Sequence, residues 1–369
     1  MHQVELQRRE PDYTLITVVS LLLGIGILMV YTSSSAMAEA DFGNPLHFFQ
    51  RQTLWALISL GSMLVFARIP PWFWQKHAPK IALAAVIGLI VVLIPGIGIY
   101  RLGARRWIGA GPAQIQPSEI AKFAFVIFLA DYLSKRDREL EDFWRGLGPP
   151  LLGLLLCFAL IMLEPDLGTS LTLGATCFLM LFVGGARLEH LGFLTLGAAA
   201  GVFGLAKIDP ERMSRLTTYL NPWSDPTDSG YQIIQALLAF GSGGLFGVGL
   251  GRSRQKFFYL PERHTDMIFA VLGEELGLIG AVFVLLLFFI FAWRGYRIAV
   301  SAPDRFTSLL AAGITSLITL QAAMNIAVVT ASIPSTGIPL PFVSYGGSSL
   351  LITLSGVGLL LGVSRYVRN

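Results

Sequence analysis

The stretch YLPERHTDMIFAVLGEELGLIG, residues 259–280, starts as a polar loop and continues as a long apolar helix. It places Asp266 where the loop meets the helix. A carboxylate at such a boundary can stay hydrated enough to ionise, yet it lies close enough to hydrocarbon to meet a lipid-borne substrate. We therefore predict that Asp266 is the reactive group.

The composition of the whole chain also indicates a membrane protein. Of its 369 residues, 54% are hydrophobic and 14% are charged, and the mean hydropathy is +0.66, which is more apolar than an ordinary soluble domain. Apolar runs of roughly 17 to 25 residues recur, and that length crosses a bilayer core of about 30 Å as a helix. The sequence predicts an all-α polytopic membrane protein.

The apolar runs predict about ten transmembrane helices in a single domain covering residues 1–369, with a tail at 1–12 and a long outer loop at 207–265. Ala36-Met37-Ala38 after the first run resembles a signal-peptidase site. Because the run is longer than the usual signal core of about 7 to 15 residues, we predict an uncleaved helix. The expected spans lie near 15–31, 53–67, 81–94, 117–133, 151–163, 167–183, 188–206, 266–293, 306–333 and 349–367.

The charge pattern indicates how these spans are oriented. An even number of spans puts both termini on one side, and a cytoplasmic placement of that side leaves most Lys and Arg residues inside, as membrane topology favours. The net charge of +4 is thereby explained without a nucleic-acid partner. Cys157 and Cys177 lie inside apolar runs, so we interpret them as core residues rather than as a disulfide or metal ligands.

Three arginines in a short outer loop, 100–116, oppose this topology. Arg101, Arg105 and Arg106 suit an anionic ligand, because the planar guanidinium binds phosphate oxygens in pairs. Attraction to anionic lipid head groups is the alternative. Glu119 and Lys122 follow, one helical turn apart below this loop. An ion pair at membrane depth marks a functional site by default, although a structural pair with a snorkelling lysine remains open.

Glu164-Pro165-Asp166 separates two apolar runs by only three residues. We expect a tight helical hairpin with both carboxylates at its outer surface. They could hold a divalent cation such as Mg²⁺ or Mn²⁺ through oxygen ligands, or form a plain solvated turn. The glycine cluster GSGGLFGVGLG, residues 241–251, matches no nucleotide-binding motif and instead predicts close backbone packing.

Cations approach Asp266 along the chain, at Arg252, Arg254 and Lys256. Such cations would lower the pKa of a carboxylate while a water-poor setting would raise it. The alternative to catalysis is that Asp266 is a helix-start acid behind a Thr265 cap. His264 could donate to an anion, but a lone interfacial histidine is more often structural.

Two further acids lie deeper in the same helix. Glu274 and Glu275 point about 80° and 180° around the helix from Asp266, so they cannot both share its face. We expect them to stabilise the bundle or a cavity, while Gly273 and Gly277 allow tight helix packing.

The segment SIPSTGIPLPFVSYGGSS, residues 332–349, carries three prolines and no charge. No helix can run through it, and non-helical backbone at membrane depth survives only against protein or a watery cavity. We predict that it lines the same outward cavity, where Ser344 and Ser348 could bond a sugar. Asn325 is better suited to interhelical hydrogen bonding.

Together these motifs carry a resemblance to a known family. The order RRWIGAGPAQIQPSEIAK, EPDLGT, NPWSDPTDSGYQIIQ, GSGGLFGVGLG, RQKFFYLPERHTDMIFAVLGEELG and TGIPLPFVSYGGSSL resembles the SEDS family of bacterial shape, elongation, division and sporulation proteins. The likeness covers nearly the whole chain. The RRWIG and RQKFFYLPE versions are more similar to the division and sporulation branch than to the rod-elongation branch.

The resemblance implies a ten-helix fold and peptidoglycan glycosyltransferase activity on lipid II, the undecaprenyl-pyrophosphate-linked disaccharide pentapeptide. It implies that Asp266 is the essential aspartate and that Arg106, Glu119 and Lys122 are functional polar positions. It also implies a class B penicillin-binding transpeptidase and other division proteins as partners at the septum. No organic cofactor is expected.

Two other functions are compatible with the residues. A lipid II flippase needs a polar path across the full bilayer, whereas the polar anomalies here cluster at outer loops and helix ends. A scaffold that only recruits a transpeptidase would tolerate the loss of Asp266.

Overall fold

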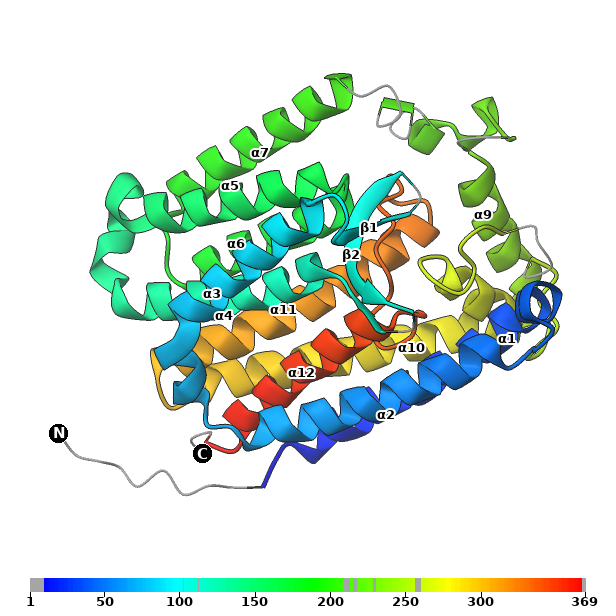
Figure 1. Cartoon of the computed structure of the whole chain (residues 1–369), viewed down its shortest axis with the longest axis horizontal. Coiled ribbons are helices and arrows are strands. Elements are labelled where there is room, and N and C mark those ends of the chain that lie inside the picture. Colours follow the sequence, from blue (N-terminus) through cyan, green and yellow to red (C-terminus); the bar gives the residue numbers. More distant parts are fainter. Residues whose placement is uncertain are drawn as a thin grey trace.

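The computed structural model describes residues 10–101, 103–111, 113–208, 213–214, 218–227, 230–255 and 260–366. Within these ranges, ten helices of 16 to 33 residues run roughly side by side along the long axis of the molecule (Figure 1). They are α1 (Tyr13–Phe42), α2 (His47–Arg68), α3 (Pro71–Leu93), α4 (Pro117–Lys135), α5 (Gly148–Leu163), α6 (Leu167–Val183), α7 (Leu188–Ile208), α10 (Ile268–Val300), α11 (Arg305–Val329) and α12 (Gly347–Ser364).

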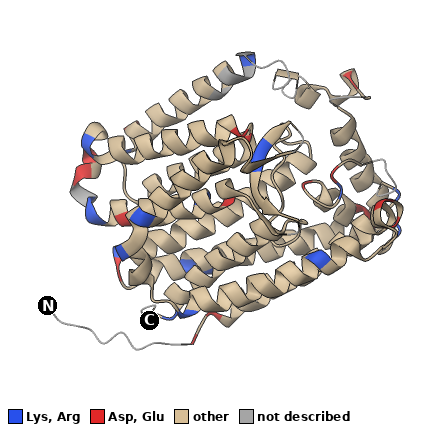
Figure 2. Cartoon of the chain, in the orientation of Figure 1, with Lys and Arg blue, Asp and Glu red and all other residues tan. Residues whose placement is uncertain are grey.

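The shorter elements lie at the helix ends. They are α9 (Tyr231–Gly243), the strands β1 (Gly98–Arg101), β2 (Ala104–Ala110) and β3 (Ala113–Ile115), and single turns at Asp137–Glu141, Phe143–Leu147 and Pro222–Ser224. Charged residues lie mostly near the two ends of the helices, and few occur along the middle of the bundle (Figure 2). This distribution is the one expected of helices that cross hydrocarbon.

The ten long helices lie where the ten spans were predicted. In the part of the chain that the structure describes, six segments are long and apolar enough by themselves to cross a membrane: α1, α3, α10, α11, α12 and 143–163, which contains α5. The chain is a multi-pass helical membrane protein, and the count of ten spans stays a prediction. The most apolar stretches of α11 and α12 are 67% and 78% buried by other helices, against 22% for α3. The first two are therefore central and α3 is peripheral.

Both ends of the described chain lie at one end of the bundle (Figure 1). The backbone N–H of Asp12, which caps α1, donates to Ser364 Oγ at the end of α12 over 3.2 Å. Arg294 Nε of α10 donates to the Asp12 carboxylate over 3.0 Å. This arrangement agrees with the predicted even number of crossings, which places both termini on one side.

A small antiparallel sheet stands at the opposite end, where the sequence analysis expected only a loop. β1 pairs with β2 and β2 with β3, and Trp107 lies opposite Ile99. Strand β2 requires glycine at position 109, where φ is 129° and a Cβ would lie 2.1 Å from the carbonyl oxygen of Ala113. The sheet holds the cationic loop rigidly over the helix ends.

Helix α10 is broken at Gly277, whose φ of 68° is left-handed. The glycine-rich segment 244–249 repairs the break: the N–H of Leu278 donates to the carbonyl of Gly244 over 2.9 Å, and the N–H of Val248 donates to the carbonyl of Glu274 over 3.0 Å. Non-helical backbone inside a membrane protein needs such protein partners. The predicted close backbone packing of the glycine cluster is confirmed.

Candidate functional site

Asp266 lies in a turn two residues before α10, so the helix starts later than predicted. Met267 is the N-cap and makes no side-chain cap bond, so the predicted Thr265 cap is wrong. The Thr265 hydroxyl instead donates to Glu262 Oε2 over 2.6 Å and lies 3.3 Å from Asp266 Oδ1. Burial, followed by the neighbouring Glu262 carboxylate, raises the pKa of Asp266 to about 7. A carboxylate with that pKa can accept a proton near neutral pH.

The non-helical segment 332–346 holds this turn from the other side. Ser344 Oγ donates to the carbonyl of Thr265 over 2.5 Å, and the N–H of Tyr345 donates to the carbonyl of His264 over 2.8 Å. The prediction that no helix runs through residues 332–349 is confirmed for 332–346, whereas 347–349 form the first turn of α12. Ser344 therefore fixes the backbone next to Asp266, and its hydroxyl also accepts from the N–H of Leu340.

Asn325 on α11 connects the same two segments. Its side-chain amide donates to the carbonyl of Asp266 and to the carbonyl of Ile338, each over 2.7 Å. The interhelical role predicted for Asn325 is wrong in its partners, because both carbonyls belong to non-helical backbone, at 266 and at 338. One turn earlier on α11, the Gln321 amide donates to the carbonyl of Pro339 over 3.1 Å.

The buried pair Glu119 and Lys122 also meets α11. Lys122 Nζ lies 2.8 Å from Glu119 Oε1 and 2.8 Å from Gln321 Oε1, and its side chain is 1% exposed. Ser349 Oγ donates to the other Glu119 oxygen over 3.2 Å. Because Gln321 and Asn325 are four residues apart, the bonds to Lys122 and to the Asp266 backbone start about 6 Å apart along α11.

Arg106 reaches the hairpin between α5 and α6 rather than standing free for a ligand. Its Nε donates to the carbonyl of Glu164 over 2.7 Å, and a terminal nitrogen donates to the carbonyl of Pro165 over 2.6 Å. The guanidinium therefore connects β2 to this turn. Arg105, its neighbour, stacks over the Tyr100 ring with 5.9 Å from its guanidinium carbon to the ring centroid.

The tight hairpin is confirmed, but the prediction that both of its carboxylates are at the outer surface is wrong. Glu164 is fully buried, and its carboxyl group lies near Ser118. Burial, followed by the Asp166 charge, raises the pKa of Glu164 to about 8. Asp166 caps α6 by accepting from the N–H and hydroxyl of Thr169 over 3.0 and 2.8 Å.

This arrangement does not fit a divalent cation between Glu164 and Asp166. One carboxylate is buried and favours its protonated form, and the other already accepts from Thr169 and from the Gln116 amide over 3.2 Å. Within the described ranges, no group of three or more His, Cys, Asp or Glu side chains is placed to hold a metal ion.

The remaining predicted ligands occupy different surroundings. His264 packs between the Phe48 and Tyr345 rings, with centroids 4.9 and 5.6 Å away, and burial lowers its pKa. Ser348 is buried in the first turn of α12, with no hydrogen-bond partner for its hydroxyl in the part of the chain that the structure describes. Lys256 lies outside the described residues.

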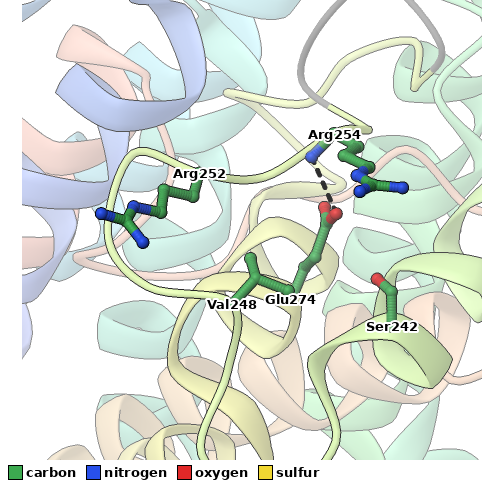
Figure 3. Close-up of a pocket in the computed structure, with 5 residues that line it drawn as sticks. All are labelled: Ser242, Val248, Arg252, Arg254 and Glu274. Carbon is green, nitrogen blue, oxygen red and sulfur yellow. Dashed lines mark hydrogen bonds between the residues drawn. The ribbon is translucent and has the colours of Figure 1, made fainter.

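A cavity of about 420 Å³ lies between α9, the glycine-rich loop and α10, two turns beyond Asp266 (Figure 3). Its lining includes Arg252, Arg254 and Glu274, together with Ser242 and Val248. The expectation that Glu274 would stabilise a cavity agrees with this position. The segment 332–349, which the sequence predicted to line an outward cavity, contributes none of the lining residues of this one.

Sequence reasoning also missed the residues that hold the site together. Gln321 accepts from Lys122, and Gln52 on α2 donates to the carbonyl of Ser344 over 3.2 Å. Both are fully or almost fully buried in apolar helices. A polar amide inside an otherwise apolar span is the signal that would have found them, because such groups are costly unless they are paired.

Comparisons with known proteins agree with this architecture. The family model of cell cycle proteins that groups FtsW, RodA and SpoVE matches residues 13–369. The chain is 49% identical over 362 residues to Stage V sporulation protein E of Bacillus subtilis (strain 168), covering 98% of this chain and 99% of that protein. It is 42% identical over 359 residues to a probable peptidoglycan glycosyltransferase FtsW of Geobacter metallireducens, covering 97% and 96%.

Solved structures share the fold. A chain from a peptidoglycan synthase complex that coordinates polymerization and crosslinking is 28% identical, with a TM-score of 0.80 over 96% of this chain and 98% of that one. The rod shape determining protein RodA of Thermus thermophilus is 27% identical, with a TM-score of 0.71 over 97% of this chain and 98% of that one.

Proposed function

Because the chain belongs to the family of cell cycle proteins that includes FtsW, RodA and SpoVE, we infer that it is a peptidoglycan glycosyltransferase of cell division or sporulation. The observation that carries the mechanism is the position of Asp266. Its raised pKa of about 7 suits a base. Helix α11 connects it to the buried Lys122, because Asn325 binds the Asp266 carbonyl and Gln321, about one helical turn away, binds Lys122.

The reaction extends a glycan strand from lipid II. Asp266 takes the proton from the 4-hydroxyl of the acceptor sugar as that oxygen attacks the anomeric carbon of the donor. The new carbon–oxygen bond forms while the bond from the anomeric carbon to the lipid diphosphate breaks, and the electron pair leaves with the diphosphate. A single displacement of this kind inverts the anomeric centre, and it needs only one carboxylate.

The leaving diphosphate requires positive charge nearby. We propose that Arg105 and Lys122 supply it, with Arg106 shaping the site through its bonds to the hairpin carbonyls of Glu164 and Pro165. Ser348 and His264 face the same end of the bundle and are proposed sugar contacts. A requirement for Mg²⁺ or Mn²⁺ remains a prediction, and the steps above do not use a metal.

We further propose the setting in which the enzyme works. Its termini are cytoplasmic, the sheet and the 332–346 segment face outward, and it acts at the division septum with a class B penicillin-binding transpeptidase. Support comes from the likeness to a chain of a synthase complex that coordinates polymerization and crosslinking and from the shared location of both chain ends.

The test is glycan synthesis from labelled lipid II by the purified protein with its transpeptidase, comparing wild type with Asp266→Asn. Because a positioned base contributes roughly 10² to 10⁴ in rate, we expect a loss of that size in the variant. A Glu139→Gln variant, changed at an exposed acid in the turn after α4, is the control. Equal synthesis by all three proteins would remove Asp266 from the mechanism, and lipid movement in vesicles without synthesis would favour a flippase.

A further inference from the structure

The cavity beside α10 is built around a loop that is fixed to that helix at both ends. At one end the N–H groups of Val248 and Gly249 donate to the carbonyls of Glu274 and Glu275 over 3.0 and 3.1 Å. At the other end the side chain of Glu274 binds the loop. Residues 249–252 form a turn between these two attachments, with the N–H of Arg252 donating to the carbonyl of Gly249 over 3.1 Å.

Glu274 is 1% exposed, and both oxygens of its carboxylate accept hydrogen bonds from the loop. Oε1 accepts from the N–H of Arg254 over 2.8 Å, and Oε2 accepts from the hydroxyl of Ser253 over 2.5 Å. The N–H of Gln255 approaches Oε2 at 3.4 Å. A carboxylate with this many donors orders the backbone it binds, so the loop presents its side chains from a fixed position.

Arg252 and Arg254 extend from this fixed loop on either side of the Glu274 carboxylate (Figure 3). Both side chains are exposed. Neither guanidinium has an ion pair or a side-chain hydrogen bond with any residue that the structure describes. By contrast, the cations predicted to bind phosphate near the sheet are largely engaged, Arg106 with two carbonyls and Lys122 with Glu119 and Gln321.

The surroundings of the arginines are apolar and open. Phe246 is 80% exposed, Leu245 is 60% exposed and Leu250 is 50% exposed, all within the loop that borders the cavity. These exposed apolar side chains lie in the same loop as the two arginines. Exposed guanidiniums beside an exposed apolar rim fit an amphiphile whose anionic head group carries a hydrocarbon tail.

We propose that this cavity is a binding site for the diphosphate group of a prenyl-linked saccharide, with Arg252 and Arg254 supplying positive charge from the two sides of Glu274, which holds the loop that presents them. The planar guanidinium pairs with phosphate oxygens through two parallel hydrogen bonds. Two guanidiniums match a diphosphate better than the single phosphodiester of a membrane phospholipid. Glu274 also lines the cavity, and its repulsion of the anion is reduced because loop donors occupy its oxygens.

This site deepens the proposed function and rests on it. Joining two lipid-linked saccharides brings two diphosphates to the enzyme, one that leaves and one that stays on its sugar. The sheet and α4 provide one cationic region, and the cavity beside α10 provides a second at Glu274, six residues or about 9 Å along the helix from its first residue, Ile268.

The test measures lipid binding to the full chain in detergent by native mass spectrometry, which needs no turnover. The probes are undecaprenyl diphosphate, undecaprenyl monophosphate and phosphatidylglycerol. The variant is Arg252→Gln/Arg254→Gln. The matched control is Arg136→Gln/Arg187→Gln, which removes two exposed arginines from surface ion pairs with Glu139 and Glu141 and changes the net charge equally.

We expect the Kd for undecaprenyl diphosphate to rise roughly tenfold or more in the variant, because charge-assisted bonds to phosphate are lost. The monophosphate should be affected less, and neither phosphatidylglycerol binding nor the control should change. Unchanged diphosphate binding would overturn the proposal, and so would an equal loss for phosphatidylglycerol, which would indicate a general head-group site. If the binding loss occurs but the wild type makes no glycan, the site stands and the proposed function fails.

Discussion

The side-chain amide of Asn325 lies 2.7 Å from the carbonyl oxygen of Asp266 and donates a hydrogen bond to it. The same amide nitrogen donates to the carbonyl of Ile338, so one residue of α11 sets the distance between the proposed base and the non-helical segment that faces it. Neither contact involves the reacting carboxylate itself, so Asn325 is a positioning residue.

Replacing Asn325 with leucine should therefore impair catalysis as well as destabilise the fold. Losing donors to two carbonyls costs about 1 to 3 kcal/mol each where the groups stay buried, and we expect kcat to fall by roughly 10- to 100-fold as Asp266 loses its alignment. The midpoint of the activity–pH profile should also move. Thr319→Val, on the same helix, is the control, and a variant with an unchanged kcat and midpoint would refute the positioning role.

Glycan synthesis should depend on pH through Asp266. Because burial raises the pKa of Asp266 to about 7, the base is protonated and inactive below that value and becomes competent above it. Initial rates measured from pH 5.5 to 9 should rise to a plateau with a midpoint near 7. A rate that is flat over this range would show that another group is the base.

The same pKa shift has a consequence for stability. The ordinary value for the Asp266 carboxyl is 3.8, so between that value and about 7 the folded state keeps a proton that the unfolded state has released. The contribution of Asp266 to stability therefore falls as pH rises through this window and is constant above it. Asp266→Asn should unfold at a higher temperature than wild type at pH 8, and the difference should shrink toward pH 4.

The Glu119 and Lys122 pair should tolerate joint removal better than single removal. Lys122→Met leaves the Glu119 carboxylate buried without its cation, which typically costs about 3 to 5 kcal/mol. The double change Glu119→Gln/Lys122→Met should recover much of that loss in a thermal unfolding assay. If Lys122 also stabilises the leaving diphosphate, the double variant should remain at least about 100-fold less active than wild type even though its stability is recovered. A stable and fully active double variant would make the pair purely structural.

Position 106 should require arginine and not accept lysine. Its two nitrogens donate to adjacent carbonyls of the hairpin, and lysine has no planar fork that can reproduce both bonds. Arg106→Lys should lose about 1 to 3 kcal/mol of stability and most activity, while Arg105→Lys, at a stacked and less constrained position, should retain both. Equal behaviour of the two variants would contradict the connecting role of Arg106.

The break in α10 should require glycine at position 277. Its φ is 68°, and a Cβ there would lie 2.3 Å from the N atom of Gly247. We expect Gly277→Ala to destabilise the protein by roughly 1 to 3 kcal/mol. Gly174→Ala, in α6 with open space around its Cα, should instead be neutral or stabilising by up to about 1 kcal/mol. Similar melting temperatures for both variants would show that α10 does not require glycine at the break.

The sequence by itself determined the class of protein, the positions of the long helices and the residues that bear charge at membrane depth. Apolar runs of span length leave a helix as the main way to satisfy the backbone, and a pair such as Glu119 and Lys122 is conspicuous because it is costly there. The motif around Asp266 could be recognised because a charged loop changes abruptly into hydrocarbon-length sequence.

Only the tertiary structure decided which polar groups are free and which are engaged. Whether Arg106 binds a ligand or two carbonyls depends on a sheet and a hairpin 58 residues apart in the chain, and no local pattern encodes that contact. Burial likewise separates Glu164 from Asp166, although one residue lies between them. The bonds of Asn325 and Gln321, and the loop fixed by Glu274 that carries Arg252 and Arg254, arise from segments distant in sequence. Their pairing depends on packing, which sets the distances on which each hydrogen bond depends.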